Sequence, residues 1–89
     1  MTAALGLARY EVALEILGLM IALRARDIAD EAASLTPDLA KIARLEADQS
    51  TFAAEIGNLL PGDLVAVEHA LSVYGPIVRA SLSASPAPG

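Results

Sequence analysis

The sequence contains no cysteine and no tryptophan, and only Tyr10, Phe52 and Tyr74 are aromatic among its 89 residues. The lack of cysteine excludes disulfide bonds and thiolate metal sites, and it leaves the redox compartment undetermined. So few aromatic rings offer little to stack on nucleic-acid bases. The chain is also short of positive charge, with 6 basic against 11 acidic residues and a net charge of −5. Such a chain repels phosphate backbones and anionic lipid surfaces, so we expect no nucleic-acid partner.

Long apolar runs are missing as well. The segment from Ile16 to Leu23 has no polar side chain, but it is only eight residues long and Glu11 and Glu15 precede it. A membrane-spanning helix needs about 20 mostly apolar residues. A signal peptide needs a basic start and an uninterrupted apolar region, which the two glutamates break. We therefore expect no integral membrane insertion, and a cytoplasmic location follows by default.

What the sequence does have is helix-forming residues. Its hydrophobic fraction is 55%, much of it alanine and leucine, and no alternating apolar pattern indicates a strand. The prediction is an all-α fold: a small bundle of three main helices at about 3–33, 37–58 and 62–82. Residues 1–83 are expected to form a single helical domain, and the Ser/Pro/Ala-rich residues 84–89 a disordered or extended tail. A chain this short buries only about 60–65% of its unfolded surface, so we expect oligomerisation to complete the bundle.

Local signals predict where the later helices start. Thr36 suits an N-cap and Pro37 the first helical position of the second helix, and Asp63 suits the N-cap of the third. Gly57 and Asn58 are signals for the end of the second helix.

Pro76 interrupts the pattern of the third helix. Its nitrogen cannot donate to the carbonyl of Ser72, and its ring crowds that turn. Gly75 loosens the backbone just before it. The sequence therefore predicts a kink or break near Gly75–Pro76.

The first helix carries two apolar rows when its residues are placed at 100° intervals. The first row is Leu7, Tyr10, Leu14, Leu17, Ile21 and Ile28. The second row, on nearly the opposite side, is Leu5, Val12, Ile16, Leu19 and Leu23. Between them lies a small-residue row of Gly18, Ala22, Ala25 and Ala29. A helix that is apolar on two sides must be covered on two sides.

These rows predict that the first helix is the centre of an assembly. An apolar row left bare by the chain's own helices would form a patch of several hundred Å², which usually marks an interface. The candidate interface residues are Leu5, Val12, Ile16, Leu19, Leu23, Leu14, Leu17, Gly18, Ile21 and Ala22. The pattern leaves open which row meets its own chain and which meets another. We expect a homo-oligomer, most simply a dimer, and a further protein partner.

The other two helices each show a single apolar stripe. The second helix has Leu35, Ile42, Leu45, Gln49, Phe52, Ile56 and Leu59; the third has Leu64, Val67, Leu71, Tyr74 and Val78. Gln49 has two equally weighted interpretations: a polar residue that fixes the helix register, or a residue at the wet edge of a drifting stripe.

No set of residues indicates catalysis. His69 is the single histidine, and its neighbours Ser72 and Glu68 do not form a nucleophile–base–acid arrangement. Glu11 and Glu15 share a helix face, but the chain has no Glu-x-x-His pair of the kind used by helical di-metal sites. We therefore expect no catalytic, cofactor or metal site.

The function favoured by these features is a non-enzymatic protein–protein interaction module of the accessory, chaperone-, antitoxin- or immunity-like kind. Two alternatives come from other classes. One is an amphipathic protein associated with a membrane or lipid surface, and the other is a small regulatory subunit of a larger enzyme or assembly.

Overall fold

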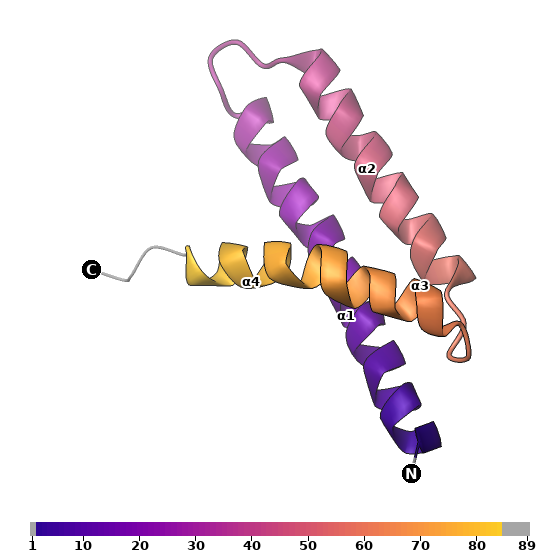
Figure 1. Cartoon of the computed structure of the whole chain (residues 1–89). Coiled ribbons are helices and arrows are strands. Elements are labelled where there is room, and N and C mark those ends of the chain that lie inside the picture. The colour runs from indigo at the N-terminus through magenta and orange to yellow at the C-terminus, as the bar shows by residue number, and fades with distance from the viewer. Residues whose placement is uncertain (1, 85–89) are drawn as a thin grey trace. The chain divides into compact units, whose positions relative to one another are not determined.

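The computed structural model describes residues 2–84, with side chains from residue 5 onward. Its helices are α1 (Thr2–Ala32), α2 (Leu39–Asn58), α3 (Leu64–His69) and α4 (Gly75–Ser83), with a π-helical segment η1 (Ala70–Tyr74) joining the last two (Figure 1). These residues contain no strand. The all-α prediction of three main helices is confirmed, because α3, η1 and α4 follow one another without a gap as the third. Most of the predicted tail, residues 85–89, lies outside the described residues.

The chain divides into two compact units that share α1. The crossing unit, named for the crossing of α1 and α4, consists of Met1–Ile16 and Leu59–Gly89. The hairpin unit is Leu17–Asn58. A single domain over residues 1–83 therefore stays a prediction, and each unit is described by itself below.

The hairpin unit is formed by the second half of α1 and by α2, which run side by side in opposite directions (Figure 1). Its buried hydrophobic side chains are Leu17, Met20, Leu45 and Phe52. Gln49 is half-buried, and its side-chain amide donates a 3.2 Å hydrogen bond to the backbone carbonyl of Ile21. Gln49 thus joins α2 to α1 through a polar contact.

The start of α2 differs from the prediction. The Asp38 carboxylate accepts a 3.1 Å hydrogen bond from the backbone N–H of Lys41, and the helix begins at Leu39. Asp38 therefore takes the capping role predicted for Thr36, and Pro37 precedes the helix. The physical reason is a contact with α1: an aspartate caps as well as a threonine, and the backbone N–H of Asp38 donates a 3.1 Å hydrogen bond to Glu31.

In the crossing unit, the buried hydrophobic residues are Ala13, Leu59, Val67, Ala70 and Val78. The predicted N-cap of the third helix is confirmed, since Asp63 Oδ1 accepts a 3.1 Å hydrogen bond from the backbone N–H of Ala66. An ion pair between Arg9 and Glu68 joins α1 to α3.

The irregularity predicted near Gly75–Pro76 is a π-helical segment that ends at Tyr74, and the chain remains helical through the proline. A π turn widens the hydrogen-bond register by one residue, which lets a helix pass a residue that has no N–H to donate. The wider turn also aligns side chains five positions apart. The rings of His69 and Tyr74 lie edge to face, with centroids 5.8 Å apart.

Candidate interaction surface

One face of α1 is buried, and it lies between the two predicted rows. Ala13, Leu17 and Met20 are at most 1% exposed and recur at helical spacings of four and three. Leu17 belongs to the first row, whereas Ala13 and Met20 belong to neither. The buried face is on the side of α1 opposite the small-residue row. Each apolar row is therefore more buried on the side near this face and more exposed on the side near the small residues.

The second row is only partly covered. Leu5 is 62% exposed, Val12 46% and Leu19 37%. Ile16 and Leu23 are half-buried. Ile16 faces the start of α4, where its Cδ1 atom lies 3.7 Å from the position a Cβ would take on Gly75.

The other candidate interface residues vary in exposure. Leu14 and Ile21 are half-buried, and Gly18 and Ala22 are exposed. A Cβ built on Gly18 would meet nothing within 4 Å, so no neighbouring helix approaches it in the described chain. Gly18 and Ala22 therefore stay predicted interface residues.

The exposed aliphatic side chains gather in the crossing unit. Of the twelve large hydrophobic residues exposed in the described chain, nine belong to it: Leu5, Leu7, Val12, Leu60, Leu64, Val65, Val73, Ile77 and Leu82. The same unit holds only six of the seventeen Lys, Arg, Asp and Glu residues. It is therefore the charge-poor part of the chain, and its surface is the candidate interaction surface.

Sequence reasoning missed much of this surface because it assigned one apolar stripe to the third helix. Leu64 belongs to that stripe but is 69% exposed, and Val65, Val73, Ile77 and Leu82 lie outside it. The signal was present in the sequence: the third helix has more large aliphatic residues than a single stripe can hold.

Charged groups on this surface fall into two kinds. Arg9 and Glu68 pair with each other, and Asp63 caps α3. The side chains of Glu11 and Glu15 on α1 and of Arg79 on α4 make no hydrogen bond or ion pair within the described residues. The unpaired carboxylates are thus on one helix, and the unpaired guanidinium is on another.

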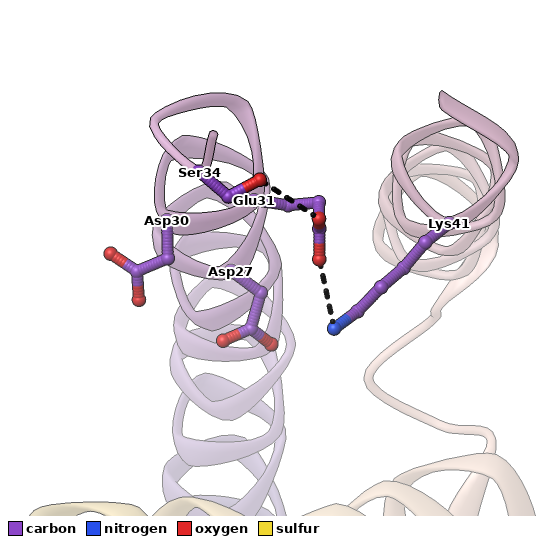
Figure 2. Close-up of a pocket in the computed structure, with 5 residues that line it drawn as sticks. All are labelled: Asp27, Asp30, Glu31, Ser34 and Lys41. Carbon is purple, nitrogen blue, oxygen red and sulfur yellow. Dashed lines mark hydrogen bonds and ion pairs between the residues drawn. The ribbon is translucent and has the colours of Figure 1, made fainter. Parts of the chain in front are cut away.

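The hairpin unit carries a polar pocket lined by Asp27, Asp30, Glu31, Ser34 and Lys41 (Figure 2). Lys41 Nζ lies 3.2 Å from Glu31 Oε1, and Ser34 Oγ donates to Glu31 Oε2 at 3.4 Å. The hydrogen bond from the backbone N–H of Asp38, followed by the bond and charge of Lys41, lowers the pKa of Glu31 below its ordinary value. Glu31 thereby ties the end of α1 to the loop and to α2.

The residues considered for chemistry are not brought together. His69 is exposed and contacts Tyr74, and the Ser72 hydroxyl donates at 2.8 Å to the carbonyl of Glu68 in its own helix. Within the described residues, no group of histidine and carboxylate side chains is arranged to hold a metal ion. The absence of catalysis stays a prediction.

None of the described helices combines the length and apolar content that crossing a bilayer requires. In comparisons with known proteins, no family model, no curated protein and no solved structure gives a significant match to this chain.

Proposed function

We propose that the protein is a non-enzymatic interaction module that acts in the cytoplasm, self-associates through the exposed side of α1 and binds a further protein partner. A homodimer is the simplest assembly. The observation that carries this proposal is that nine of the twelve large hydrophobic residues exposed in the described part of the chain belong to the crossing unit, which has few charges.

The energetics favour covering this surface. Removing apolar area from water yields about 25 cal/mol per Å², so one half-exposed leucine or valine contributes on the order of 1 kcal/mol when it is covered. Several such residues together supply the apolar centre of an interface of about 800 Å² per partner. A chain of this length also has a small core of its own, and association is a common way of supplementing it.

Val12 provides the sharpest test because it is 46% exposed on α1 and belongs to the predicted interface. Val12→Arg places a charge on the surface while the side chain can remain solvated in the monomer. Ala54→Arg is the matched control, since Ala54 is exposed on α2 and lies opposite its apolar stripe.

Sedimentation velocity from about 1 to 100 μM protein measures the assembly. We expect the wild type and Ala54→Arg to form the same dimer, and Val12→Arg to remain monomeric with unchanged helix content by circular dichroism. A wild type that stays monomeric throughout this range contradicts self-association.

The partner is tested by affinity capture from native cells with the same three proteins. A partner recovered by the wild type and Ala54→Arg but lost with Val12→Arg supports the interaction module. Flotation with neutral and anionic vesicles tests the lipid-surface alternative: binding of the wild type to vesicles, with no captured protein, favours that alternative over the proposal.

A further inference from the structure

We propose that the exposed side of α1 in one copy is covered by α4 of a second copy, with Arg79 of each chain facing Glu11 and Glu15 of the other. This inference rests on the proposed self-association and specifies its geometry. The two contacts would be related by a twofold axis, so each chain supplies both surfaces.

Leu5, Leu7 and Leu82 lie near the ends of the two helices that cross in the crossing unit. In Figure 1 the first turns of α1 and the last turns of α4 each extend past the point where these helices cross. The projecting part of α1 carries Leu5 and Leu7, which are 62% and 49% exposed, and that of α4 carries Leu82, which is 66% exposed. Neither projecting part is covered within its own unit.

Charges of opposite sign flank the exposed aliphatic residues of α1 and α4. Glu11 is one turn from Leu7, and Glu15 is one turn from Val12, so both carboxylates border exposed aliphatic side chains of α1. Arg79 is likewise one turn before Leu82 on α4. All three charges lack a partner within the described residues of their own chain.

Charge complementarity therefore favours α4 of the second copy as the helix that covers α1. Two α1 helices facing each other would bring Glu11 and Glu15 against their own copies, and two α4 helices would bring Arg79 against Arg79. Both arrangements juxtapose like charges, whereas α1 against α4 pairs opposite ones at two equivalent places. Complementary charges across an interface determine register and partner choice more than affinity.

The test is a charge reversal in the full chain, read out by sedimentation equilibrium. Arg79→Glu is one variant, and Glu11→Arg with Glu15→Arg is the second. We expect each to raise the dimer dissociation constant by at least about tenfold, because two attractive contacts become repulsive. Combining all three substitutions in one chain should return the constant to within about threefold of wild type.

Mixing the two variants gives the decisive measurement. In a mixed dimer, one contact is the native pairing and the other is the reversed pairing, so both are attractive. We expect the heterodimer to form in preference to either homodimer, which a mass-tagged chain makes visible by native mass spectrometry. Charges that compensate each other within one chain would not favour the heterodimer over the two homodimers.

Arg44→Glu and Glu46→Arg are the matched controls, since both residues are exposed on α2 in the hairpin unit. They should leave the dissociation constant unchanged. A wild-type dimer that is insensitive to the α1 and α4 reversals, or no more sensitive to them than to the controls, overturns this pairing and leaves the proposed function standing. A monomeric wild type overturns both.

Discussion

Ile16 and Gly75 face each other where α1 and α4 cross, with 3.7 Å between Cδ1 of Ile16 and the position of a Cβ on Gly75. That distance is an ordinary van der Waals contact, so a methyl group fits at this site and would touch Ile16. Gly75 also has right-handed helical backbone angles, with φ −54° and ψ −51°, which any L-residue adopts.

Gly75→Ala should therefore stabilise the protein by about 0.5–1 kcal/mol, because alanine favours the helix and loses less backbone entropy on folding. Urea unfolding followed by circular dichroism measures this change. Gly18→Ala is the matched control in open space and should give a similar gain. Gly75→Ile, in contrast, should destabilise the fold by about 1–3 kcal/mol through overpacking. Destabilisation by Gly75→Ala would show that the contact is tighter than 3.7 Å.

Leu17 lies on the buried face of α1, whereas Leu19 lies on its exposed side. Both belong to apolar rows predicted from the sequence. Leu17 is 0% exposed and Leu19 is 37% exposed. Leu17→Ala should reduce the free energy of unfolding by about 2–5 kcal/mol because it leaves a cavity. Leu19→Ala should cost less than about 1.5 kcal/mol. Chemical denaturation at a single low protein concentration provides the comparison, and equal losses would place the buried face elsewhere.

Glu31 should make stability depend on pH. Its pKa in the folded state is lowered from 4.5, so its contribution is present above the unfolded value and is lost as pH falls through the lowered one. Glu31→Gln removes this titration. The wild type should be the more stable protein at pH 7, and its advantage should shrink as pH is taken progressively below 4.5.

Thermal unfolding of both proteins across that pH range measures the difference. Glu46→Gln, at an exposed position of α2, serves as the control and should follow the wild type at every pH. A stability difference between the wild type and Glu31→Gln that stays constant from pH 7 to acid pH would mean that the hydrogen bonds from Asp38 and Lys41 do not form in solution.

The ion pair between Arg9 and Glu68 joins residues 59 positions apart, but both side chains are about half exposed, at 46% and 55%. Solvent screening limits the stabilisation that this ion pair provides. Glu68→Gln should therefore lower the free energy of unfolding by no more than about 1 kcal/mol at low ionic strength. The cost should fall further when salt is added. A double-mutant cycle with Arg9→Gln isolates the pair, and a coupling above about 2 kcal/mol would show that the pair is better shielded from water than its exposure indicates.

The all-α class and the approximate extent of the three helices are determined by the sequence alone. Helix propensity is a local property, and so is the capping by Asp63, whose side chain bonds a backbone N–H only three residues away. The start of α2 shows the limit of such reasoning. Thr36 and Asp38 are both competent caps, and the bond from the backbone of Asp38 to Glu31, seven residues away, selects between them.

The buried face of α1 is decided only by the tertiary structure. Apolar and small residues surround this helix on nearly every side, so periodicity alone fits several buried faces equally well. Ala13 and Met20 on the buried face belong to neither predicted row, and they are buried because of how the other helices pack. The exposure of the aliphatic residues of α4 and the pairing of Arg9 with Glu68 are likewise decided only by the tertiary structure. These depend on which distant segments meet, which is a property of packing and not of any local pattern.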